Sequence, residues 1–171
     1  MPAPDQGIQT SLDRHRYLSI PRTLIFLTRE DRVLLLKGAP DKPIWAGKWN
    51  GVGGHVERDE SVLAGALREA REETGLRVDD ARLAGILHID AGHPDCGVML
   101  YVFVAEAPHG EPTGSREGDL RWFPRDALPE ADLVEDLKII LPKALDRPGL
   151  SPPFFGRSYY APDGKLTIAF A

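Results

Sequence analysis

The chain is organised around the stretch Gly54-His-Val-Glu-Arg-Asp-Glu60-Ser61-Val-Leu-Ala-Gly-Ala-Leu-Arg68-Glu69-Ala-Arg-Glu72-Glu73-Thr-Gly75-Leu76. Ser61 is a favourable N-cap residue, and Gly75 is placed to end a helix by taking a left-handed conformation. Between them, residues that can pack on a core recur at spacings of three and four: Leu63, Ala66, Leu67, Ala70 and Thr74. This periodicity predicts a helix with one face packed against the rest of the chain.

The other face of this predicted helix carries three carboxylates. Glu69, Glu72 and Glu73 stand at positions i, i+3 and i+4, so their side chains gather on one side. Like charges at such short separation are destabilising unless a cation neutralises them. Several carboxylates together with water are suitable ligands for Mg²⁺ or Mn²⁺. The alternative is a solvated acidic face on which Arg68 and Arg71 supply local ion pairs.

The spacing of the whole stretch distinguishes these alternatives. Gly54 is followed after five residues by Glu60, and after seven more by Arg-Glu-Ala-Arg-Glu-Glu-Thr-Gly-Leu. This pattern resembles the signature of the Nudix hydrolase family, with Ala70 as its least typical position. The resemblance covers about residues 17–145. It implies a loop–helix–loop that binds metal and the diphosphate of a nucleoside diphosphate linked to another group.

Composition limits the possible functions. At 171 residues, with 42% hydrophobic and 27% charged residues, the chain is expected to form one globular domain over residues 17–171. A flexible polar arm is predicted at residues 1–16. The net charge of −5 argues against a nucleic-acid polymer as partner, but not against a nucleotide, because bound metal can supply positive charge locally.

Cysteine usage and hydropathy bear on the compartment. The single cysteine, Cys96, excludes an internal disulfide and is typical of a reducing cytoplasm. Neither a signal-peptide pattern nor an apolar run of about 18 residues is found, so no membrane contact is expected. Both a monomer and a homodimer are compatible with the sequence.

Apolar, β-branched runs predict the strands of a sheet. We expect strands at residues 17–28, 33–37, 81–89, 97–106 and 120–124, the first interrupted by Pro21 and the fourth central. A second amphipathic helix is predicted at residues 135–145, where Pro142 is expected to bend or end it. Residues 154–171 are predicted to form a hairpin. Together these elements predict an α/β/α sandwich around a mixed β-sheet, the fold that the Nudix resemblance also implies.

Candidate substrate-binding residues lie outside the signature. The segment Trp49-Asn-Gly-Val-Gly-Gly54 is similar to that of the Nudix branch that hydrolyses oxidised purine nucleoside triphosphates. This resemblance implies that Asn50 hydrogen-bonds the base and that an acidic pair, Glu135 and Asp136, also reads it. The alternative for Asn50 is a turn residue beside glycine. Where that branch has a stacking Trp near the acidic pair, this chain has Leu133, so stacking would come from elsewhere.

The resemblance also implies which residues hold metal. Mg²⁺, or Mn²⁺ in its place, would bind the carboxylates of Glu69, Glu72 and Glu73 and the backbone carbonyl of Gly53. Phosphoryl transfer depends mainly on positioning and charge neutralisation, and bound metal lowers the pKa of a water. A carboxylate then takes the proton from that water.

The remaining residues of the predicted site have supporting roles. The proton acceptor would be a Glu of the signature or Glu117 from a later loop, and the alternative for Glu117 is an exposed loop carboxylate. Arg68 would orient the helix by pairing with a Glu. Glu60 would brace the loop, while Gly54 and Gly75 have structural roles at the two ends of the motif.

The predicted reaction is hydrolysis of a nucleoside triphosphate to a nucleoside monophosphate and pyrophosphate. Dinucleotide polyphosphates and nucleotide sugars are alternative substrates, although sequence features of the ADP-ribose, NADH, diadenosine polyphosphate and coenzyme A hydrolases are not found. A non-catalytic nucleotide-sensing module is a further alternative. The intact set of Glu69, Glu72 and Glu73 argues against it, since a sensor has no need of a catalytic cluster.

Overall fold

An eight-stranded mixed sheet forms the centre of the protein, and the computed structural model describes residues 16–114, 118–146 and 151–171 of it. Along the main path the strands are β3 (Trp49–Asn50), β2 (Arg32–Gly38), β1 (Leu18–Arg29), β5 (Cys96–Glu106), β4 (Arg82–Ile89), β7 (Phe154–Tyr160) and β8 (Leu166–Phe170). The eighth strand, β6 (Gly118–Pro124), pairs with β2. Two pairs, β1 with β5 and β4 with β7, are parallel, and the others are antiparallel.

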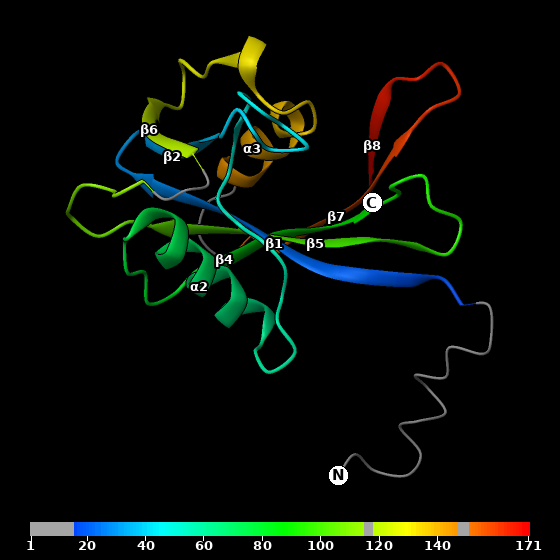
Figure 1. Cartoon of the computed structure of the whole chain (residues 1–171), viewed down its shortest axis with the longest axis horizontal. Coiled ribbons are helices and arrows are strands. Elements are labelled where there is room, and N and C mark those ends of the chain that lie inside the picture. Colours follow the sequence, from blue (N-terminus) through cyan, green and yellow to red (C-terminus); the bar gives the residue numbers. More distant parts are fainter. Residues whose placement is uncertain (1–15, 115–117, 147–150) are drawn as a thin grey trace.

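In the described residues, one helix covers each face of the sheet. Helix α2 (Val62–Thr74) packs beneath β1 in the view of Figure 1, and α3 (Leu137–Leu145) lies above it. Successive residues of β1 alternate between the two faces: Ile25 and Leu27 join the core under α2, whereas Leu24 and Phe26 join the core under α3. The predicted α/β/α sandwich around a mixed sheet is confirmed.

The signature helix has the ends that its sequence predicts. The Ser61 hydroxyl accepts a hydrogen bond from the backbone N–H of Ala64 at 3.2 Å, and Gly75 takes φ of 71° while its N–H donates to the carbonyl of Arg71 at 2.8 Å. Ala66 and Ala70 are fully buried, which lets α2 approach the sheet closely. The inward face is therefore the one that the periodicity indicates.

Strand β1 differs from the prediction because it runs through Pro21 without interruption. Its parallel register with β5 is continuous from Leu18 to Thr28. The N–H groups of Thr23 and Ile25 donate to loop carbonyls on the opposite side from β5, at 2.8 and 2.7 Å. Pro21 shares their alternation, so its missing N–H falls on the loop side and leaves the ladder with β5 intact.

The other predicted elements are found with small changes of boundary. β5 is at the centre of the strand path, and β7 and β8 form the predicted C-terminal hairpin. α3 begins at Leu137 instead of residue 135, and Pro142 lies inside it without ending it. The structure also contains two short elements: β3, and a 3-10 turn η1 (Glu130–Asp132).

The predicted N-terminal arm, residues 1–16, lies outside the described residues except for Arg16. Within the described ranges, no helix has the length and apolar character needed to cross a bilayer.

Candidate active site

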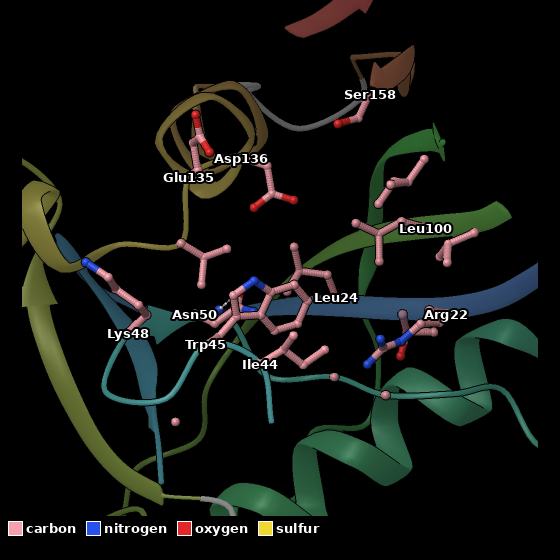
Figure 2. Close-up of a pocket in the computed structure, with 18 of the residues that line it drawn as sticks. Arg22, Leu24, Ile44, Trp45, Lys48, Asn50, Leu100, Glu135, Asp136 and Ser158 are labelled. Carbon is pink, nitrogen blue, oxygen red and sulfur yellow. Dashed lines mark hydrogen bonds between the residues drawn. The ribbon is translucent and has the colours of Figure 1, made fainter. Parts of the chain in front are cut away.

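A cleft of about 1100 Å³ opens on the α3 side of the sheet and reaches to α2. Leu24, Val98 and Leu100 from the strands line it. The glycine loop with Glu69 and Glu73 lines it at one end. Figure 2 shows the other walls: the loop carrying Ile44 and Trp45, and the segment that enters α3. One cleft therefore joins segments that are far apart in the sequence.

Glu73 is the most buried of the three helix carboxylates, with 8% of the residue exposed. Its Oε2 accepts a hydrogen bond from the backbone N–H of Gly53 at 3.0 Å. Burial raises the pKa of Glu73 to about 7, and the negative charge of Glu69 raises it further, while the Gly53 N–H and the cations Lys42 and Arg22 oppose the rise. A carboxylate in this setting has a strong electrostatic preference for a nearby cation.

Arg68 holds the remaining acidic residues of the motif together. Its Nε and Nη2 donate to Glu60 in a bidentate pair at 3.0 and 2.8 Å. Its Nη1 donates to Glu69 at 2.9 Å and to Glu72 at 3.0 Å, and Nη2 also reaches the carbonyl of His55 at 3.1 Å. The guanidinium thus ties the loop before α2 to the helix itself.

These ion pairs shift the pKa values of both partners. The hydrogen bonds from Arg68, followed by the N–H of Glu57, hold the pKa of Glu60 below its ordinary value. Glu60 in turn raises the pKa of Arg68, with a further contribution from Glu69. Both groups are therefore charged throughout the neutral range, and the brace between loop and helix is permanent there.

The glycine pair permits the close approach of loop and helix. Gly53 has φ of 153°, in a region that side chains other than glycine rarely adopt, and a Cβ there would collide with the backbone of Thr23. A Cβ on Gly54 would collide with the carboxylate of Glu69. The N–H of Thr23 also fixes the loop by donating to the carbonyl of Gly54 at 2.8 Å.

The predicted base-reading residues lie in the same cleft. Asn50, Glu135 and Asp136 all line it, the last two at the entry to α3 (Figure 2). Asp136 is half-buried, and burial, with a smaller contribution from Glu135, raises the pKa of its carboxyl. Glu135 is exposed. The Oδ1 of Asn50 accepts a hydrogen bond from the N–H of Gly51 at 2.8 Å, which is the local contact expected of a turn residue. Asn50 also lines the cleft, so both interpretations of this residue agree with its position.

The structure separates the three helix carboxylates more than the sequence predicts. Glu69 and Glu73 line the cleft, whereas the Glu72 side chain is 59% exposed and paired with Arg68. In residues 16–114, 118–146 and 151–171, no three His, Cys, Asp or Glu side chains converge as a preformed metal site. Glu117, the loop candidate for proton acceptor, lies outside the described residues.

Several cleft residues had no signal in the sequence. Arg22 precedes the buried part of β1, Trp45 lies in a loop with two prolines, and Ser158 is buried in the C-terminal hairpin. Their positions depend on long-range strand pairing, such as the bridge between Arg22 and His55. Local patterns carry no information about such contacts.

Comparison with known proteins identifies the family to which this fold and cleft belong. The NUDIX domain family matches residues 19–144. The chain is 37% identical over 126 residues to an oxidized purine nucleoside triphosphate hydrolase from Mus musculus, covering 73% of this chain and 79% of the relative. It is 33% identical over 123 residues to a NAD-capped RNA hydrolase from Pseudomonas aeruginosa, of which it covers 41%.

Similarity to a solved structure supports the same family. The crystal structure of a mutator MutT protein from Bacillus halodurans superposes with a TM-score of 0.72 and 31% identity, covering 88% of this chain and 97% of the other. The chain belongs to the Nudix family. It is a Nudix hydrolase, an enzyme of the class that cleaves pyrophosphate bonds in nucleotides.

Nudix hydrolases generally use divalent metal ions, and the donors in this cleft fit one. The carboxylates of Glu69 and Glu73 provide hard oxygen ligands of the type that Mg²⁺ prefers. The raised pKa of Glu73 reflects burial and the neighbouring charge of Glu69, and a bound dication would offset both. The oxygen donors of this cleft are therefore suitable ligands for a divalent metal ion.

Proposed function

We propose that this Nudix hydrolase requires Mg²⁺ and converts a nucleoside triphosphate with an oxidised purine base to the nucleoside monophosphate and pyrophosphate. The observation that carries the proposal is the composition of the cleft. Glu69 and Glu73 meet the glycine loop at one end, and Asn50 and Asp136 face the same space further along. A ligand with a phosphate chain and a hydrogen-bonding base matches this arrangement. The similarity to the mouse hydrolase supports the choice of base.

Glu69, Glu72 and Glu73, with the backbone carbonyl of Gly53, are the residues that would hold the metal. When bound, Mg²⁺ neutralises phosphate charge and lowers the pKa of a water. The chain supplies the positioning. Arg68 fixes the carboxylate of Glu69 through the bond at 2.9 Å, and the Gly53 N–H fixes that of Glu73 at 3.0 Å. The proton acceptor for the attacking water is one of the α2 carboxylates or Glu117.

The proposed base contacts follow from the hydrogen-bonding capacity of the side chains. Because Oδ1 of Asn50 accepts from the N–H of Gly51, its amide Nδ2–H is the group that would donate to a base. Asp136, with its raised pKa, can keep a proton at a pH where an ordinary aspartate has lost it, and can then also donate. Oxidation of guanine at C8 adds a carbonyl and converts a ring nitrogen from acceptor to donor, which a site of this kind can discriminate.

A substrate panel with products resolved by chromatography tests this proposal. Nucleoside triphosphates, 8-oxo-dGTP, dinucleotide polyphosphates, NADH and nucleotide sugars are incubated with and without Mg²⁺. We expect 8-oxo-dGTP to be hydrolysed with a higher kcat/KM than dGTP, to give monophosphate and pyrophosphate, and EDTA to abolish the reaction. Inorganic phosphate as the only small product, or a rate that EDTA leaves unchanged, would contradict the reaction. Equal kcat/KM for both triphosphates would contradict the base assignment alone.

The alternative is another nucleoside diphosphate derivative as substrate. The similarity to the NAD-capped RNA hydrolase favours keeping it, since the shared segment includes the catalytic signature. The same panel distinguishes it, because none of these substrates releases pyrophosphate. NADH would give two nucleoside monophosphates, a dinucleotide polyphosphate two nucleotides that share all its phosphates, and a nucleotide sugar a nucleoside monophosphate and a sugar phosphate.

A further inference from the structure

Trp45 has a backbone conformation that is unusual for a large aromatic residue. Its φ is 61°, and Glu30, in the turn between β1 and β2, is the other non-glycine residue with positive φ in the described ranges. A bulky side chain in this region is a steric outlier that the surrounding structure must hold in place. Residues with such strain cluster at active sites, ligand-binding positions and switch regions.

Hydrogen bonds to the neighbouring backbone hold Trp45 in this conformation. Its carbonyl accepts from the N–H of Lys48 at 3.0 Å, which closes a tight turn over residues 45–48. Gly38 at the end of β2 secures that turn: its N–H donates to the carbonyl of Lys48 at 2.9 Å, and its carbonyl accepts from Gly47 at 2.8 Å. These hydrogen bonds attach the turn to β2 and thereby fix the backbone position of Trp45.

The three tryptophans of the chain differ in their packing. Trp49 is 7% exposed and meets the ring of Phe123 edge-on at 4.8 Å. Trp122 lies beneath the guanidinium of Arg29, 4.6 Å from the ring centroid. Trp45 is 44% exposed, and in the part of the chain that the structure describes its indole makes neither kind of aromatic contact. Strain at Trp45 is therefore not offset by burial of its ring.

The indole of Trp45 projects into the cleft beside Ile44, which is 59% exposed, in the region that Asn50 lines (Figure 2). The carboxyl of Asp136 lies across the cleft from it in this view. Leu133, the aliphatic residue near the acidic pair, is buried with 3% exposure and provides no aromatic surface there. Trp45 therefore offers an exposed aromatic face beside Asn50, whereas Tyr160, the other exposed aromatic residue among the described residues that line the cleft, belongs to β7.

We propose that Trp45 is a substrate-binding residue that stacks on the planar base of the nucleotide while Asn50 and Asp136 contact its edge. This inference rests on the proposed function, and it adds the residue that supplies the stacking surface. Aromatic stacking on a base is worth about 1–3 kcal/mol when measured by alanine substitution, and it depends on the π-face rather than on the hydrogen-bonding groups. Trp45 would therefore increase affinity for bases in general, and the residues at the edge would choose among them.

Equilibrium binding without turnover tests the proposal. The full chain is titrated with a nucleoside monophosphate, 8-oxo-dGMP, in EDTA, and separately with tripolyphosphate, which has no base, in Mg²⁺. We expect Trp45→Gly and Trp45→Ala to raise the Kd for 8-oxo-dGMP by about tenfold or more, within the range known for stacking. Trp45→Phe should stay within about threefold of the wild type, since it keeps an aromatic face. Binding of tripolyphosphate should not change.

Intrinsic fluorescence gives a second readout. Binding of 8-oxo-dGMP should quench the emission of the wild type, and the quenching should disappear in Trp45→Phe although that variant still binds. Phe155→Ala is the matched control, because Phe155 is 52% exposed and lies outside the cleft lining. It should leave both Kd and quenching as in the wild type.

Thermal stability separates stacking from a structural role. Glycine accepts φ of 61° without strain, so Trp45→Gly should unfold at the same temperature as the wild type or a higher one. A lower melting temperature with an unchanged Kd would assign Trp45 to the fold and overturn the proposal. So would equal losses for 8-oxo-dGMP and tripolyphosphate. If the wild type binds 8-oxo-dGMP through Trp45 but hydrolyses no triphosphate, the proposed function fails and this inference stands.

Discussion

The two ends of the cleft are built in different ways. The helix end, formed by Gly53, Gly54, Glu69 and Glu73, is held by short hydrogen bonds and by the clamp of Arg68. The loop end, formed by Ile44, Trp45, Asn50 and Asp136, exposes two large apolar side chains and a carboxyl with a raised pKa. Rigid placement suits a group that must activate or neutralise charge, because misplacement of a catalytic group is costly. Exposed side chains suit recognition of the base, because the ligand covers them when it binds.

The largest expected effect is at the helix end. Glu73→Gln and Glu72→Gln each remove an anionic ligand while keeping size, so kcat should fall by at least about a hundredfold. Steady-state kinetics at saturating Mg²⁺ measure this. The two variants also sharpen the comparison, because Glu73 is buried whereas the side chain of Glu72 is 59% exposed. A loss of about tenfold or less would give that residue a structural role.

A smaller effect is expected at the loop end. Asn50→Ala removes the donor proposed for the base, and KM for 8-oxo-dGTP should rise by about tenfold, equivalent to about 1.4 kcal/mol. Metal affinity should be nearly unchanged, because Asn50 is not a proposed ligand. Kinetics with 8-oxo-dGTP and a Mg²⁺ titration check the two statements. A drop in kcat with KM unchanged would place Asn50 in the chemistry instead of the recognition of the base.

The smallest effect concerns stability. The pKa of Asp136 is raised in the folded chain, so the native state holds its proton more tightly than the unfolded state does. Wild-type stability should then fall as pH rises from the ordinary aspartate value towards and through the raised one. Asp136→Asn escapes this loss, and its melting temperature relative to wild type should increase with pH, by a few degrees for about 1 kcal/mol.

Thermal melts between pH 4 and pH 8 in EDTA measure this difference. Glu135→Gln is the control, because it makes the same carboxyl-to-amide change at the neighbouring exposed position. A constant difference between Asp136→Asn and wild type across the range would show that Asp136 titrates normally. The loop end would then lack the protonated donor proposed for the base.

The two ends also differ in how far the sequence predicts them. The helix end follows from local patterns: Ser61 and Gly75 mark the helix, and the spacing of its Glu residues identifies the family. Even there, the burial of Glu73 was not evident, since helical spacing places it beside the exposed Glu72. Burial is a tertiary property, and it depends on how closely the glycine loop approaches the helix.

The loop end depends on contacts between distant segments, which a single sequence does not reveal. The positive φ of Trp45 accompanies a turn over residues 45–48 that Gly47 and Lys48 attach to Gly38 by hydrogen bonds, and the residue type at position 45 does not signal it. Asp136 was predicted through family resemblance, but its half-buried setting follows from the packing of α3. The two-residue strand β3 is too short for a period to be visible in the sequence.

The parallel pairing of β7 with β4 has a consequence for how such enzymes diversify. The hairpin of β7 and β8 lies beyond the segment that matches the family, residues 19–144, yet Ser158, Tyr160 and Leu166 from it line the cleft. Substitutions in this hairpin can reshape one wall of the cleft without altering any residue of the signature. The ligand preference of the cleft can therefore change, by evolution or by engineering, through substitutions in the hairpin while the residues of the signature stay the same.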